Sequence, residues 1–90
     1  MSRIKITVYG RVQGVGFRYH TRQKAKELNL TGYVMNKPDH TVEIVADGAD
    51  AQLQLLVAWA RVGPDRASVK RIELEDCLPI NRFDEFVVEY

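Results

Sequence analysis

The sequence predicts an α+β fold in which two helices cover one face of a sheet. Two observations support this prediction. Five short segments read as strands, and in the first and the last of them apolar residues recur with a period of two, which is typical of strands with one buried face. Two further segments carry apolar residues at helical spacing. The chain has 90 residues, enough for one modest core, so we expect a single domain spanning 1–90.

The first strand is expected near the N-terminus, where Ile4, Ile6 and Val8 alternate with polar residues. The glycine-containing segment 10–16 interrupts this alternation. From 17 to 29 the period becomes helical, because basic residues fill one face and four other residues fall on the opposite face: Phe17, Thr21, Ala25 and Leu28. We therefore expect a strand–loop–helix connection whose loop lies at one end of the sheet, near the strands that follow.

A hairpin is expected next. Residues 31–37 and 41–47 both read as strands. The residues between them, Pro38, Asp39 and His40, have turn chemistry.

The second helix is expected over 49–62. Leu53, Leu56 and Ala60 form its apolar stripe, and the other leucines and Trp59 are expected to join them in the core. Glycine and proline at 63–64 end the helix.

Two more strands complete the chain. Val69, Ile72 and Leu74 mark the fourth, and the change of parity between Val69 and Ile72 indicates a bulge. The last strand is expected from the alternation of Phe86, Val88 and Tyr90. The order is βαββαβ with an extra C-terminal strand. Two helices on one face of an antiparallel sheet form the ferredoxin-like sandwich, which hosts many unrelated activities, so function must be argued from individual residues.

Composition excludes several classes of function. The 13 basic and 12 acidic residues give a net charge of +1, which argues against non-specific attraction to nucleic acid or to a membrane surface. Cys77 is the only cysteine, so no intrachain disulfide can form, and with His20 and His40 it makes no structural metal site. A reducing compartment, the cytoplasm, fits best. The longest apolar run, 55–60, is far too short to cross a bilayer.

The segment 12–20, VQGVGFRYH, carries the strongest functional signal. Gly14 and Gly16 permit backbone conformations in which successive N–H groups point at one spot and bind an anion. Arg18 is unfavourable at the positive end of a helix dipole unless an anion neutralises it there. A glycine pair before a helix is also typical of an ordinary turn, and the spacing does not match a P-loop or a dinucleotide fingerprint.

Two longer motifs contain this segment or follow it in the sequence. YGRVQGVGFR, followed by LTGYVMNKPDHTVEI, resembles the acylphosphatase family, small enzymes that hydrolyse carboxyl-phosphate mixed anhydrides. The resemblance covers nearly the whole chain. It implies a small-molecule acyl phosphate substrate and two catalytic residues, Arg18 and Asn36. It also implies that phosphate is bound by Gln13, Gly14, Val15, Gly16, Phe17 and Arg18.

The chemistry implied by these residues needs no cofactor or metal ion, because an arginine and the loop amides can supply the positive field. An amide does not accept a proton near neutral pH, so Asn36 is expected to aim a water molecule at phosphorus. We expect the proton to pass to a phosphoryl oxygen of the substrate. His20 is a second candidate by its place in the sequence, and Asn36 read alone could simply cap the hairpin.

The chain departs from the family pattern at His40, where the family usually has glycine. A left-handed conformation at a non-glycine residue costs about 1–2 kcal/mol, so we expect a changed or less stable turn. The basic face of the first helix, which includes Arg22, is expected to be solvated surface that attracts the anionic substrate.

Two other functions compete with hydrolysis. An RNA-binding sheet would need outward aromatic residues on adjacent strands, and Tyr9 and Tyr33 are too scattered for this. A regulatory module that binds acyl or carbamoyl phosphate without hydrolysis is the closer alternative. We expect a free-standing enzyme that acts as a monomer.

Overall fold

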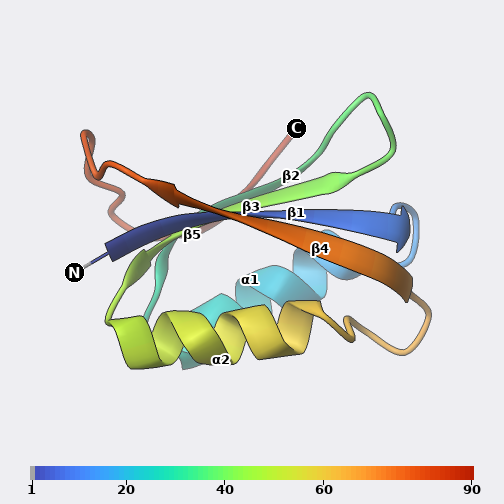
Figure 1. Ribbon diagram of the computed structural model, residues 1–90, viewed down its shortest axis with the longest axis horizontal. Coiled ribbons are helices and arrows are strands. Elements are labelled where there is room, and N and C mark those ends of the chain that lie inside the picture. Colours follow the sequence, from blue (N-terminus) through green and yellow to red (C-terminus); the bar gives the residue numbers. More distant parts are fainter. Residues whose placement is uncertain (1) are drawn as a thin grey trace.

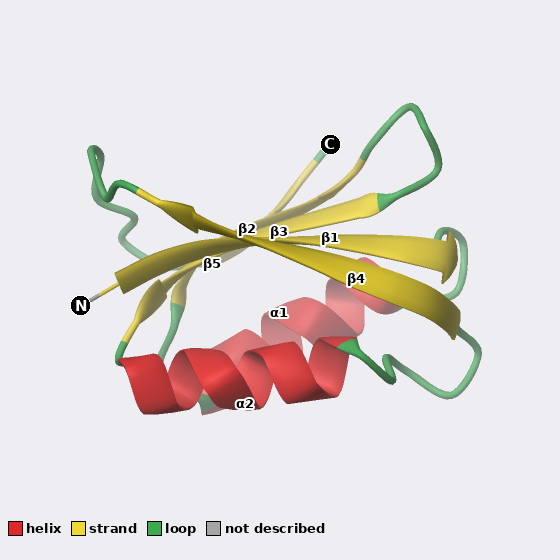
Figure 2. Ribbon diagram, viewed as in Figure 1, coloured by secondary structure: helices red, strands yellow, loops and turns green. Residues whose placement is uncertain are grey.

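Two helices lie against one face of a five-stranded sheet in the computed structural model, which describes residues 2–90 (Figure 1). The layers separate clearly when the chain is coloured by secondary structure (Figure 2). The elements are β1 (Ser2–Arg11), α1 (Phe17–Glu27), β2 (Thr31–Asn36), β3 (Val42–Gly48), α2 (Asp50–Ala60), β4 (Ser68–Cys77) and β5 (Phe86–Glu89). Neither helix is long and apolar enough to span a membrane.

The strand order is β4-β1-β3-β2-β5. β1 pairs antiparallel with β3 and β4, and β2 pairs antiparallel with β3. β5 runs parallel to β2, so the sheet is mixed at this one edge. The predicted ferredoxin-like fold with an extra C-terminal strand is confirmed, and the parallel edge pairing is the detail that the sequence did not indicate.

The core lies between the sheet and the helices. Ile6, Val8, Val34 and Ile44 are fully buried on the helix-covered face of the sheet. The predicted buried face of α1 is confirmed at all four of its positions, since each has at most 7% of its surface exposed: Phe17, Thr21, Ala25 and Leu28.

The stripe of α2 is narrower than expected. Leu53 and Leu56 are buried, as predicted, but Leu55 is 52% exposed. Because Leu55 lies only two residues from Leu53, the helical twist of about 100° per residue turns it toward solvent. Trp59 is partly buried, and its ring centroid lies 5.4 Å from that of Phe17, so it borders the core where the two helices meet.

The predicted bulge is present in β4. Tyr9 pairs with Arg71 and the next residue, Gly10, pairs with Val69, which leaves Lys70 as the extra residue. The change of parity read from the sequence therefore has a structural cause.

In the hairpin between β2 and β3, His40 adopts the left-handed conformation for which glycine is usually preferred. The His40 amide donates to the Lys37 carbonyl and the Lys37 amide donates to the Thr41 carbonyl, as in a three-residue loop. His40 adopts a φ of 72°. The left-handed conformation is thus retained at a non-glycine residue, and its strain remains in the folded protein.

Candidate active site

The start of α1 and the loop before it form an open corner whose chemistry suits an anion (the anion corner). Gly14 and Gly16 have φ values of 73° and 81°, so both turns of the loop need glycine. Gly16 is the N-cap residue and supplies no side-chain cap, and the first turn has no acidic residue. Among residues 2–90, no acceptor pairs with the backbone amides of residues 17–19. These amides are free to bind an anion at the positive end of the helix dipole.

A cavity of about 450 Å³ lies in front of this corner. Five of the residues predicted for the site line it: Gly14, Gly16, Phe17, Arg18 and Asn36. The cavity has no acidic residue in its lining. The loop after β1, the first turn of α1 and the end of β2 therefore meet at one basic hollow.

Arg18 lies in this hollow without a carboxylate partner. It is partly buried, and it is absent from the four ion pairs found within residues 2–90. Its guanidinium carbon lies 4.9 Å from the centroid of the Tyr90 ring. An aromatic face attracts a cation while the N–H donors of that cation stay available.

Asn36 reaches the cavity because of its position in β2. Its neighbour two residues back, Val34, is fully buried on the helix-covered face, and alternation places Asn36 on the same face. Its Oδ1 atom is buried and has no hydrogen-bond partner in the part of the chain that the structure describes. An unpaired buried carbonyl oxygen is uncommon in folded proteins, and this one is free to accept a hydrogen bond from a molecule in the cavity.

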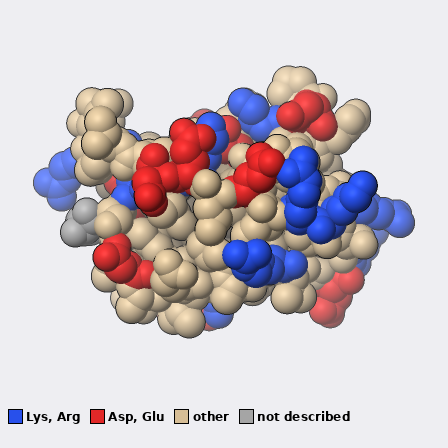
Figure 3. Space-filling view, viewed as in Figure 1, with Lys and Arg blue, Asp and Glu red and all other residues tan. Residues whose placement is uncertain are grey.

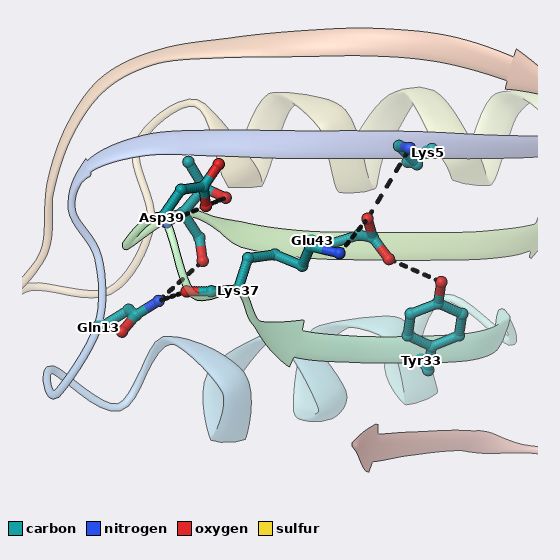
Figure 4. Close-up of polar contacts among 7 residues, drawn as sticks. Lys5, Gln13, Tyr33, Lys37, Asp39 and Glu43 are labelled. Atoms are coloured by element: carbon teal, nitrogen blue, oxygen red, sulfur yellow. Dashed lines mark hydrogen bonds and ion pairs between the residues drawn. The ribbon is translucent and has the colours of Figure 1, made fainter. Parts of the chain in front are cut away.

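The side chain of Gln13 connects the glycine loop to the hairpin. Its Nε2 atom donates to the carbonyl oxygens of Lys37 and Thr41, both at 2.9 Å (Figure 4). This amide joins the glycine loop to the hairpin, which confirms that the two lie together. The side chain of Gln13 does not line the cavity.

Val15 and Phe17 also direct their side chains away from the anion corner. Both are buried, with 6% and 1% of their surface exposed, and both belong to the hydrophobic core. Any contact that these two residues make with an anion therefore comes from the backbone.

His20 is not brought to the cavity. Its Nδ1 atom lies 2.8 Å from the Gly16 carbonyl oxygen, and its ring borders a separate hollow beside Trp59 and Pro64. Its ring nitrogens do not face the space between Arg18 and Asn36.

Five further residues line the cavity that the sequence did not assign to a site: Val12, Tyr19, Arg22, Val88 and Tyr90. Arg22 follows Arg18 by four residues, so helical spacing alone places the two on one face. Val88 and Tyr90 share the alternation of the last strand, but the sequence does not indicate that this strand lies beside β2.

Basic side chains gather at the end of the molecule where β1 ends and β4 begins (Figure 3). The loop that precedes α1 lies at the same end (Figure 1). Acidic side chains concentrate farther along β4 in the same view. The charge is therefore unevenly distributed although the net charge is only +1.

Comparison with known proteins identifies relatives of this arrangement. The acylphosphatase family model matches residues 4–88. An acylphosphatase from Methylococcus capsulatus is 43% identical over 88 residues, which cover 98% of this chain and 96% of the relative. The crystal structure of acylphosphatase from Bacillus subtilis matches with a TM-score of 0.95 at 36% identity, with 100% of both chains covered. The crystal structure of T. kodakarensis HypF matches with a TM-score of 0.88 at 33% identity, and this chain covers 12% of that protein.

Proposed function

The chain belongs to the acylphosphatase family, whose members hydrolyse acyl phosphates, and we propose how its residues carry out this reaction. Water attacks phosphorus in line with the carboxylate leaving group, without a metal ion. The observation that carries the proposal is the meeting, in one cavity, of the glycine loop, Arg18 and the unpaired Oδ1 of Asn36.

The phosphoryl group binds at the start of α1. Backbone amides of residues 14–18 donate to its oxygens, and the planar guanidinium of Arg18 donates to two oxygens at once. Because these donors are already in place, they stabilise the charge of the transition state with little reorganisation.

Asn36 positions the attacking water. Its buried Oδ1 accepts one hydrogen of the water and so fixes the direction of the oxygen lone pair. The water oxygen forms a bond to phosphorus, the bond from phosphorus to the acyl oxygen breaks, and the carboxylate leaves with the electron pair. A phosphoryl oxygen of the substrate takes the proton, since His20 lies outside this space.

The decisive experiment is phosphate release from benzoyl phosphate by the native chain and by Arg18→Lys. Lysine keeps the charge but cannot donate to two oxygens in one plane, so kcat/KM should fall by at least about 100-fold. Arg61→Lys is a matched control, because Arg61 is exposed at the end of α2 and outside the cavity. Activity of Arg18→Lys within tenfold of the native value would contradict the proposal. Activity should also survive EDTA.

A regulatory module that binds without hydrolysing is the second candidate. It is favoured only by the match to HypF, of which this chain covers 12%. Binding of acyl phosphate with no release of phosphate would support it.

We also propose that residues 1–90 act as one domain, as a monomer, in the cytoplasm. The family match over 4–88 supports the first of these. Sedimentation equilibrium of the native chain would test the second.

A further inference from the structure

Arg22 is a second arginine in the cavity that the proposed reaction does not use. It is partly buried and lines the cavity together with Arg18. Within residues 2–90 it takes part in no ion pair and in no side-chain hydrogen bond. A partly desolvated cation without a counter-ion is unfavourable, and its like-charged neighbour one helical turn away adds repulsion.

The position of Arg22 separates it from the phosphoryl group. Phosphate binds at the first turn of α1, whereas Arg22 lies four residues farther along, about 6 Å along the helix axis. The cavity is also lined by Tyr19 of α1, by Val88 of β5 and by Tyr90, the residue that follows β5. These side chains offer aromatic and apolar surface to the acyl part of a bound substrate.

We propose that Arg22 binds a second anionic group on the acyl part of the substrate. The preferred substrates would then be acyl phosphates whose acyl group has a short apolar body and a negatively charged end. This inference rests on the proposed function, since it assumes that the phosphoryl group occupies the first turn of α1. A guanidinium that forms no ion pair within the described residues is suited to a carboxylate or phosphate of the substrate.

Three substrates built on the same ring test the inference: benzoyl, 3-carboxybenzoyl and 3-carbamoylbenzoyl phosphate. The carbamoyl group has the size of the carboxylate without its charge, and the rigid ring prevents either group from reaching the anhydride. The native chain should prefer the carboxylate over the carbamoyl compound by about tenfold in kcat/KM, mainly through KM.

Arg22→Gln should abolish this preference, and Arg22→Lys should retain part of it. Lys26→Gln is the matched control, because it removes the same charge from an exposed position on α1 outside the cavity. It should leave the preference within about twofold of the native value, because solvent and salt screen an exposed charge.

Three results would overturn the inference. The native chain could hydrolyse the two substituted substrates equally well. Lys26→Gln could remove the preference as fully as Arg22→Gln, which would indicate general attraction of anions. Arg22→Gln could weaken inhibition by inorganic phosphate as much as it raises the KM for the carboxylate, which would place Arg22 on the phosphoryl group. Hydrolysis of benzoyl phosphate that depends on Arg18 would leave the proposed function standing in all three cases.

Discussion

The guanidinium carbon of Arg18 lies 4.9 Å from the centre of the Tyr90 ring, and no carboxylate within residues 2–90 pairs with this arginine. An acidic partner would hold the side chain more firmly, but it would compete with the anionic substrate for the same N–H donors. An aromatic face attracts the cation without occupying those donors. The arrangement therefore favours this position of the arginine and leaves its donors available for an anion.

Tyr90→Leu tests this relationship. Loss of the aromatic face should lower kcat/KM for benzoyl phosphate by about two- to fivefold, which corresponds to the ~0.5–1 kcal/mol of an exposed cation–π contact. Tyr90→Phe keeps the ring and should stay within about twofold of the native value. Equal losses in the two variants would show that the hydroxyl, and not the ring, is what matters.

Asn36→Ala should separate catalysis from binding. Turnover should fall by at least about tenfold, while the inhibition constant for phosphate changes by about twofold or less, because Asn36 directs water and does not hold the anion. The free energy of unfolding should rise by about 1 kcal/mol, since the substitution removes a buried oxygen without a partner. Steady-state kinetics and urea unfolding measure the two effects. A large loss of phosphate affinity would assign Asn36 to binding instead.

His40→Gly should stabilise the protein. At a φ of 72°, glycine avoids strain of about 1 kcal/mol that histidine bears, which corresponds to a rise of about 4–8 °C in Tm for a domain of this size. Activity should be unchanged, because His40 does not line the cavity. Calorimetry gives the result, and an unchanged or lower Tm would show that the turn holds His40 without strain.

Tyr33→Phe should change stability at alkaline pH. Burial, and then the hydrogen bond that the Tyr33 hydroxyl donates to Glu43 at 2.8 Å (Figure 4), raise the pKa of Tyr33 from 10.0 to about 12. The folded state therefore favours the protonated hydroxyl. The stabilisation that this provides is complete below pH 10 and is lost as the pH rises toward 12. Unfolding free energies across this interval should fall more steeply for the native chain than for Tyr33→Phe. Parallel curves would contradict the raised pKa.

The sequence predicted the elements that leave a periodic signal. The change from a period of two to helical spacing located the boundary between β1 and α1, and the parity of Val69 and Ile72 located the bulge at Lys70. Residue type alone predicts that Leu55 joins the core, whereas its spacing from Leu53 places it toward solvent, as the structure shows. For Leu55, helical spacing predicts exposure better than residue type does.

The candidate site was only partly predictable, for a physical reason. Alternation shows which residues of a strand share a face, but not which strand lies next to it or in which direction it runs. Tyr90 could be assigned to the face of Val88, but the contact with Arg18 follows from the parallel pairing of β5 with β2. The place of Asn36 in one cavity with Arg18 likewise depends on how the loop after β1 and the first turn of α1 meet the end of β2.

Gln13 is bonded to carbonyl groups on both sides of the hairpin turn, and the residues that follow it form the anion corner. A change in turn length or turn sequence that moves those carbonyls would also move the loop. A library of turn variants over residues 38–40, selected for phosphate affinity, would thus sample new loop geometries while every group that touches the anion keeps its native identity. Substitutions in a turn that does not touch the anion would therefore change the affinity for phosphate.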